Sequence, residues 1–128
     1  MTPSWGTEVV PLADSREGGI WAPVPGDFSA AVTLVVTITL ESLAPPYLQA
    51  GWNLTDSIDG ERWWNVADTD GLYEKRFNLS QATGVMHSTA RFVVPFGPHL
   101  GVSVSQYGAS DHDKAFRDAT AKLFWRKL

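Results

Sequence analysis

The sequence predicts an all-β fold, an antiparallel β-sandwich with jelly-roll or immunoglobulin-like topology. Three observations support this prediction. The segment AAVTLVVTITLE, residues 30–41, places apolar side chains at every second position, which is typical of a long half-buried strand. Shorter apolar segments occur along the chain, and turn residues separate them at regular intervals. Only the C-terminal segment contains a pattern that also fits a helix.

Glycine, proline and aspartate turns separate the expected strands. The first turn is the segment ADSREGG, residues 13–19, which we expect to contain no strand. The hydrophobic side chains between such turns predict one core in one domain, residues 1–128. The expected strands before the C-terminal segment are 7–12, 20–24, 30–41, 48–55, 62–67, 72–79, 87–96 and 100–106.

The two ends of the chain each allow two interpretations. In KAFRDATAKLFWRKL, residues 114–128, helical spacing relates Phe116, Ala119 and Leu123, whereas strand alternation places Ala119, Leu123 and Trp125 on one face. We predict a closing strand, because a lone helix would need a sheet face to cover. Residues 1–6, which include Trp5, form either an arm that orders on a neighbouring subunit or a frayed terminus.

Composition excludes several classes of function. The 128 residues contain no cysteine, so a disulfide framework, a zinc–thiolate site and a thiol nucleophile are impossible. The net charge of −4 argues against a nucleic-acid-binding surface. The N-terminus lacks the pattern of an export signal, and the longest apolar stretch is too short to span a bilayer, so we expect no membrane role.

No catalytic motif is present, and we expect a protein that is not an enzyme and holds no cofactor or metal. The three histidines are scattered, and no G-x-S-x-G, P-loop or H-E-x-x-H sequence occurs. Asp68-Thr69-Asp70-Gly71 begins like a calcium loop, but the further ligands of such a loop are missing. Asp111-His112-Asp113 is a second acidic turn. We interpret both as solvated hairpin loops.

The adjacent tryptophans of SIDGERWWNV, residues 57–66, pose the main functional question. In a strand, neighbouring side chains point to opposite faces, so only one of these indoles faces the core. A two- or four-residue connection centred on Asp59-Gly60 places Trp63 on the face of Leu54. A three-residue connection with Gly60 in the left-handed conformation places Trp64 there instead. The other indole is covered by the chain's own loops or presents a flat apolar surface to a partner.

Ser57-x-Asp59-Gly60-x-x-Trp63 resembles the Asp-box hairpin of sialidase-like proteins with one residue fewer. That resemblance implies a strand–turn–strand unit in which the tryptophan packs inward. A complete sialidase propeller is impossible at this length.

The longer order of segments resembles small β-sandwich proteins of bacteriophage virions, including capsid decoration (cement) proteins. It runs from PLADSREGG through VTLVVTITLESL, SIDGERWWNV and FVVPFGPHLGVSVSQYG to the final strand. One departure is Gly101, where the pattern leads us to expect arginine. The resemblance implies a structural protein on the capsid surface of the virion, made in the host cytoplasm. It would bind the major capsid protein lattice as a homo-oligomer on the particle.

The residues that we expect at such an interface are aromatic or rigid. Trp5 and Trp64 supply indole rings, and Pro45, Pro46 and Tyr47 form a rigid loop that ends in an amphipathic ring. The alternative function is that of a carbohydrate-binding β-sandwich module, in which exposed tryptophan and tyrosine stack on sugar rings.

Overall fold

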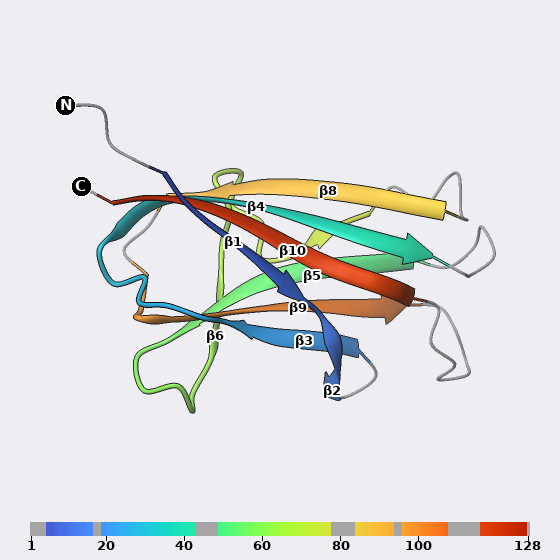
Figure 1. The fold of residues 1–128 in the computed structure, drawn as a ribbon, viewed down its shortest axis with the longest axis horizontal. Helices are drawn as coiled ribbons and strands as arrows, with labels where there is room; N and C mark the ends of the chain where they lie inside the picture. The colour runs from blue at the N-terminus through green and yellow to red at the C-terminus, as the bar shows by residue number, and fades with distance from the viewer. Residues whose placement is uncertain are drawn as a thin grey trace.

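The computed structural model describes residues 5–16, 19–42, 49–77, 84–93, 96–107 and 116–127. Every regular element within these ranges is a β-strand, which confirms the predicted all-β class. The strands form two antiparallel sheets that pack face to face as a sandwich (Figure 1). Within the described part of the chain, no helix is long and apolar enough to cross a membrane.

The smaller sheet has four strands and contains the long strand that the alternation predicts. The edge strands of this sheet are β1 and β8. Strands β10 and β4 lie in the middle and pair with each other over most of their length. In spatial order the strands are β1 (Trp5–Pro11), β10 (Phe116–Lys127), β4 (Ala31–Ser42) and β8 (Gly84–Phe92).

The larger sheet has six strands, and the adjacent residues Trp63 and Trp64 lie at one of its edges. Strand β9 is at its centre and pairs with β3 and β5, while β6 and the two-residue β7 both pair with β5. The strands are β2 (Ala13–Arg16), β3 (Gly19–Val24), β9 (His99–Tyr107), β5 (Gln49–Ser57), β6 (Trp64–Val66) and β7 (Lys75–Arg76).

The connectivity is that of a jelly roll. Strands β1, β4, β8 and β10 belong to the smaller sheet, and the chain crosses to the larger sheet between each of them. With the short edge strand β2 set aside, the order β1-β10-β4-β8 facing β3-β9-β5-β6 is the pairing of two interleaved Greek keys. Of the two topologies that the sequence allows, the structure therefore has the jelly roll and not the immunoglobulin-like one.

The core lies between the sheets and follows the predicted alternation. Leu34, Val36, Ile38 and Leu40 of β4 are completely buried. Trp52 of β5 is also buried, as predicted, with 1% of its surface exposed. Its indole Nε1 donates a hydrogen bond of 2.8 Å to the hydroxyl of Ser88 on β8. Because β5 and β8 belong to different sheets, this bond joins the sheets directly.

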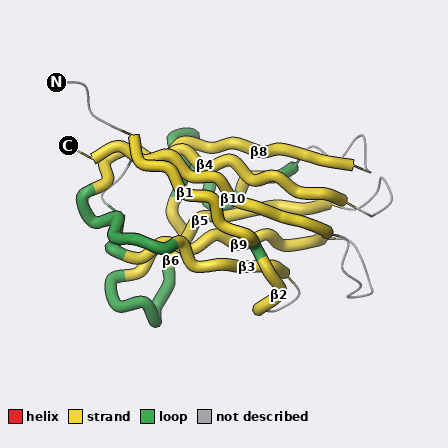
Figure 2. The backbone as a smooth tube through the Cα atoms, in the orientation of Figure 1, coloured by secondary structure: helices red, strands yellow, loops and turns green. Residues whose placement is uncertain are grey.

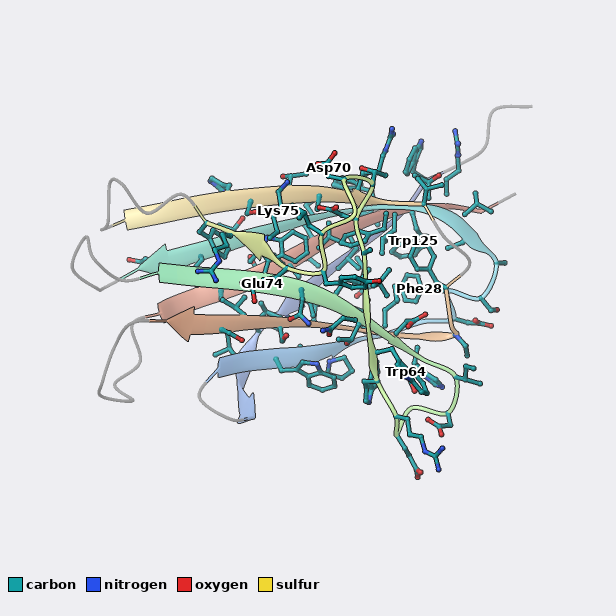
Figure 3. The ribbon with its side chains drawn as sticks, turned by 180° about the vertical axis from the view of Figure 1, so that it is seen from behind. Phe28, Trp64, Asp70, Glu74, Lys75 and Trp125 are labelled. Carbon is teal, nitrogen blue, oxygen red and sulfur yellow. The ribbon has the colours of Figure 1, made fainter. Side chains whose placement is uncertain are left out.

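An aromatic pair closes one end of the sandwich. The rings of Phe28 and Trp125 meet edge to face with centroids 5.0 Å apart, and Figure 3 shows both side chains at this end. The loops between β3 and β4 and between β5 and β6 lie at the same end (Figure 2). We call this the loop end of the sandwich. Loop residues of different parts of the sequence therefore meet here.

The C-terminal segment is a strand, as predicted. Ala119, Ala121 and Leu123 of β10 are buried, and Trp125 packs against the core from the same face. This face was the one that strand alternation indicated. Pairing with both β1 and β4 decides the outcome, because a strand in the middle of a sheet satisfies its backbone on both sides.

Two parts of the N-terminal region differ from the expectation. Ala13 and Asp14 lie in a strand that pairs with Trp21 and Ile20, although their segment was expected to be a turn. The polar residues of β2 are compatible with this position because β2 is an edge strand. Trp5, expected within either an arm or a frayed terminus, is the first residue of β1 and pairs with Arg126. Residues 1–4 lie outside the described part, so the arm stays a prediction for them.

The expected strand 72–79 is much shorter in the structure. Only Lys75–Arg76 pair with β5, and residues 78–79 lie outside the described ranges. The reason is a local turn before β7. The Asp68 carboxylate accepts hydrogen bonds from the amides of Asp70 and Leu72, both 2.9 Å, and Gly71 has a φ of +82°. The backbone is therefore still turning where the strand was expected to begin.

Candidate functional site

The adjacent tryptophans lie on opposite sides of the larger sheet. Asp56 pairs with Trp64, and Leu54 pairs with Val66, so the Trp64 side chain is on the core-facing side of β6. This is the register of the three-residue alternative, and Gly60 has the left-handed φ of +78° that this alternative requires. Trp64 lies beyond the end of the core, however, and 54% of its surface is exposed.

Trp63 is on the outer side of the sheet and is half-buried. Its ring meets that of Trp21 edge to face, with centroids 5.5 Å apart. The inward packing that the Asp-box resemblance implied is therefore not observed for this residue. The physical reason is the register, because the pairing of Asp56 with Trp64 leaves the preceding side chain on the opposite face.

The turn between β5 and β6 is held by one serine and one aspartate. Ser57, which is buried, donates its hydroxyl to the Asp59 carboxylate at 3.1 Å and accepts a hydrogen bond of 2.8 Å from the amide of Gly60. The same Asp59 oxygen accepts hydrogen bonds from the amides of Glu61 and Arg62, at 2.8 and 2.9 Å. These residues make the strand–turn–strand unit that the Asp-box resemblance implied.

Hydrogen bonds in this turn favour the ionised form of Asp59. The amides of Arg62 and Glu61 lower the pKa of the Asp59 carboxyl from its ordinary value of 3.8, and the Ser57 hydroxyl adds to the effect. The side chain is fully exposed. The ionised carboxylate therefore orders the turn backbone without being removed from solvent.

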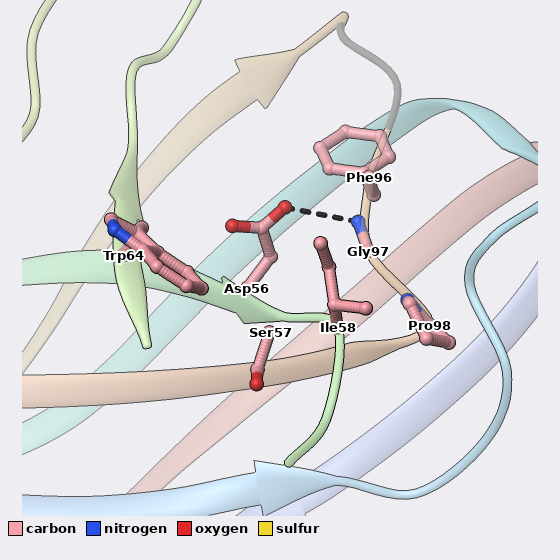
Figure 4. Close-up of a pocket in the computed structure, with 7 residues that line it drawn as sticks. All are labelled: Asp56, Ser57, Ile58, Trp64, Phe96, Gly97 and Pro98. Atoms are coloured by element: carbon pink, nitrogen blue, oxygen red, sulfur yellow. Dashed lines mark hydrogen bonds between the residues drawn. The ribbon is translucent and has the colours of Figure 1, made fainter. Parts of the chain in front are cut away.

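A pocket of about 410 Å³ opens beside this turn at the loop end. Figure 4 shows the indole of Trp64 on one side and Ile58 on the other, with Asp56 between them. Ile58 is 76% exposed although it is a large apolar residue. The lining residues are Asp56, Ser57, Ile58, Trp64, Phe96, Gly97 and Pro98, and we call this set the loop-end pocket.

The residues 96–98 form one wall of the loop-end pocket and are fixed to β5. The amide of Gly97 donates a hydrogen bond of 2.9 Å to the Asp56 carboxylate. Gly97 also lies so close to β5 that a Cβ added there would be 2.6 Å from the carbonyl oxygen of Ser57. A glycine is therefore needed for this approach of the two backbones.

The loop-end pocket is suited to binding an apolar group. Its aromatic and aliphatic members are Ile58, Trp64, Phe96 and Pro98. The Asp56 carboxylate is engaged by Gly97, and the Ser57 hydroxyl is engaged within the turn. Sequence reasoning found Trp64 but missed Ile58, Phe96 and Pro98. The sequence did contain a signal for Ile58, because a large apolar residue between Ser57 and Asp59 in a turn is expected to be exposed.

Trp5, the second expected interface tryptophan, lies at the same end as Trp64 but on the smaller sheet. It is 44% exposed, and the guanidinium of Arg126 lies 5.6 Å from the centre of its ring. The next residue of β10, after Arg126, pairs with Ala31 at the start of β4. The amide of Phe28 in the loop before β4 donates to the carbonyl of Pro98 in the pocket wall, at 3.2 Å.

The other predicted interface residues, Pro45, Pro46 and Tyr47, lie outside the described residues. The strands on either side of them are β4, which ends at Ser42, and β5, which begins at Gln49. These two strand ends are at the opposite end of the sandwich from Trp64 (Figure 1). The interface role of the three residues stays a prediction.

The first acidic cluster is a hydrogen-bonded turn. Asp68 is buried and accepts from two backbone amides, as described above, and the amide of Thr69 donates to the carbonyl of Arg91 at 2.8 Å. Within the described residues, no three histidine or acidic side chains gather closely enough to hold a metal ion. The second cluster, Asp111-His112-Asp113, lies outside these residues.

Comparison with known proteins yields no family assignment. No protein-family model matches the chain, and no curated protein matches it. The fold and the geometry of the loop end are therefore the basis for proposing a function.

Proposed function

We propose that this protein is a structural protein of a bacteriophage virion, a capsid decoration (cement) protein that docks on the major capsid protein shell through its loop end. The observation that carries the proposal is the exposure of Trp64 and Ile58 at the loop-end pocket. Tryptophan is strongly enriched among the residues that dominate binding energy at protein interfaces. A pocket beside it can accept an apolar side chain from the partner.

The rigidity of the turn supports docking by this surface. Ile58 lies between Ser57 and Asp59, whose side chains hold the turn through hydrogen bonds. A preorganised loop loses little conformational entropy when it binds, so more of the contact energy contributes to affinity. Trp5 provides a second exposed indole at the same end, from the other sheet.

Docking of this kind would stabilise the shell by mass action. A protein that binds assembled capsid subunits and not the free ones shifts the equilibrium towards the assembled shell. Copies of this chain would then occupy equivalent lattice positions as a homo-oligomer on the particle. The jelly roll is also an architecture of viral capsid domains, as well as of lectins, and this analogy of fold is compatible with a place in the virion.

The test is to purify the phage particles and determine the copy number of this chain relative to the major capsid protein by quantitative mass spectrometry. We expect a constant ratio that matches a set of lattice positions. Trp64→Ala should reduce incorporation at least about tenfold, since interface tryptophans commonly contribute that much. Trp63→Ala is the matched control, because it removes the neighbouring indole on the opposite face and should leave incorporation unchanged. Absence from the particles, or equal incorporation of both variants, would overturn the proposal.

A further inference from the structure

A second aromatic surface lies on the outer face of the larger sheet, away from the loop-end pocket. Trp21 comes from β3, and Trp63 directly precedes β6, although β9 and β5 lie between these strands. Their rings meet at 82° with centroids 5.5 Å apart. Both side chains are half-buried. The plane of one indole is therefore nearly perpendicular to the plane of the other.

Gly101 explains how the two indoles reach each other. A Cβ added at Gly101 would be 2.9 Å from Cζ2 of Trp21 and 3.1 Å from Oγ1 of Thr55. The Trp21 ring therefore lies directly over β9 at the position where the strand has no side chain. Thr55 is buried beside it and donates its hydroxyl to the carbonyl of Gly101 at 3.2 Å. The expected arginine at position 101 would exclude this arrangement.

A row of uncharged polar side chains crosses the same face. The hydroxyl of Ser103 on β9 donates to Oδ1 of Asn53 on β5, and Nδ2 of Asn53 donates to Oδ1 of Asn65 on β6 at 2.7 Å. Each bond fixes the orientation of the next amide. Asn65 is exposed, and its Nδ2 has no hydrogen-bond partner in the described part of the chain. The row therefore ends in a fixed donor group that faces solvent.

The chemistry of this face is neutral. Cross-strand pairing places Trp21 opposite Ser103 and Ser103 opposite Asn53. The two indoles and the polar row therefore form one continuous surface. The five side chains of the indole pair and the polar row carry no charge, although the whole chain has a net charge of −4. Glu74 lies over Gly51 further along β5 and pairs with Arg76 at 3.3 Å. That ion pair is balanced and leaves the face without excess charge.

We propose that this surface, the aromatic–amide face of Trp21, Trp63, Asn53, Asn65 and Ser103, binds a neutral sugar. The C–H bonds of a pyranose ring pack against an indole, while its hydroxyl groups exchange hydrogen bonds with amide and hydroxyl side chains. Each sugar hydroxyl both donates and accepts, so a single ring can satisfy the donors and acceptors of the polar row. The inference uses residues other than those of the loop-end pocket and does not depend on the proposed function.

The experiment is an NMR titration of the full ¹⁵N-labelled chain with short neutral oligosaccharides of glucose, galactose, mannose and N-acetylglucosamine, at up to about 10 mM. The indole N–H signals are assigned from single tryptophan variants. We expect one class of oligosaccharide to shift the signals of Trp21 and Trp63, while those of Trp52 and Trp64 stay in place.

Two variants separate a binding role from a structural one. Asn65→Asp keeps the oxygen that accepts from Asn53 but removes the outward donor, and we expect about fivefold weaker binding with an unchanged thermal unfolding temperature. Trp63→Ala should abolish the shifts at Trp21, whereas Trp64→Ala should leave binding intact. No shift with any of the oligosaccharides, or equal binding by the Asn65→Asp and wild-type proteins, would overturn the inference. None of these outcomes bears on incorporation into particles, so the two proposals fail independently.

Discussion

Trp63 packs edge to face against Trp21 across two intervening strands, with ring centroids 5.5 Å apart. The next residue, Trp64, is directed to the other side of the sheet and lies at the loop-end pocket. A pair of neighbouring tryptophans therefore belongs to two separate surfaces. This division makes each indole the control for the other in experiments on the two surfaces.

Gly101→Ala should destabilise the protein and separate the indole pair. The new Cβ would approach Cζ2 of Trp21 to 2.9 Å, so the ring must move. Overpacking of this kind costs about 1–3 kcal/mol, and we expect about 1 kcal/mol because Trp21 lies at the surface. Urea unfolding measures the loss, and near-UV circular dichroism reports the separation of the rings. In a Trp21→Ala background the same substitution should cost clearly less, because only the 3.1 Å approach to Oγ1 of Thr55 remains. An equal cost in both backgrounds would contradict this explanation.

The hydrogen bond between Trp52 and Ser88 should contribute about 1 kcal/mol to stability. It joins the two sheets inside the sandwich, where water cannot replace either partner easily. A double-mutant cycle with Trp52→Phe and Ser88→Ala isolates the coupling from the loss of volume at position 52. The measurement is the free energy of unfolding of all four proteins in urea. Purely additive effects would show that the bond contributes no net stability.

Asp59 should make the stability of the fold depend on pH in acid. Its folded-state pKa lies below the unfolded value of 3.8, so the ionised form favours folding. This contribution is complete above that value and is lost as the pH falls through the lowered pKa. Urea midpoints measured between about pH 6 and pH 2 should fall less steeply for Asp59→Asn than for the wild type. Glu61→Gln is the control, because its side chain accepts none of the hydrogen bonds of the turn, and it should keep the wild-type slope.

Gly97→Ala should disrupt the wall of the loop-end pocket. The added Cβ would lie 2.6 Å from the backbone oxygen of Ser57, and a backbone atom in β5 cannot move aside cheaply. We expect a loss of about 1–3 kcal/mol in unfolding free energy, together with a change in the amide signal of residue 97 as its bond to Asp56 breaks. Pro98→Ala alters the same pocket without such an approach and should cost less. A Gly97→Ala protein of wild-type stability would show that the two backbones separate freely.

Local pattern was sufficient for the fold class and for much of the core. From Leu34 to Leu40 in β4 and from Ala119 to Leu123 in β10, every second side chain is buried, so the period of two in the sequence directly identifies these inward residues. The same reasoning placed Trp52 in the core. It failed for β2, whose sequence Ala-Asp-Ser-Arg has no apolar alternation to mark a strand, and for β7, where the hydrogen bonds of Asp68 hold the chain in a turn.

The candidate surfaces were less predictable because they depend on register and on contacts between distant segments. Trp64 was expected at a partner interface, and whether it or Trp63 faces the core was left open. The pocket beside it needs residues 96–98, which a hydrogen bond between Asp56 and Gly97 brings to β5. The role of Gly101 was hidden for the same reason. Only the pairing of β3 with β9 brings Trp21 over it.

By itself, the sequence determined that this chain forms an antiparallel β-sandwich and which faces of its long strands are buried. These properties follow from alternation along one strand, where each side chain's direction depends only on its neighbours. The tertiary structure alone decided the jelly-roll order of the strands, the separation of Trp63 from Trp64 and the meeting of Trp63 with Trp21. These depend on how strands far apart in the sequence pair, and a shift of one residue in that pairing would exchange the two faces.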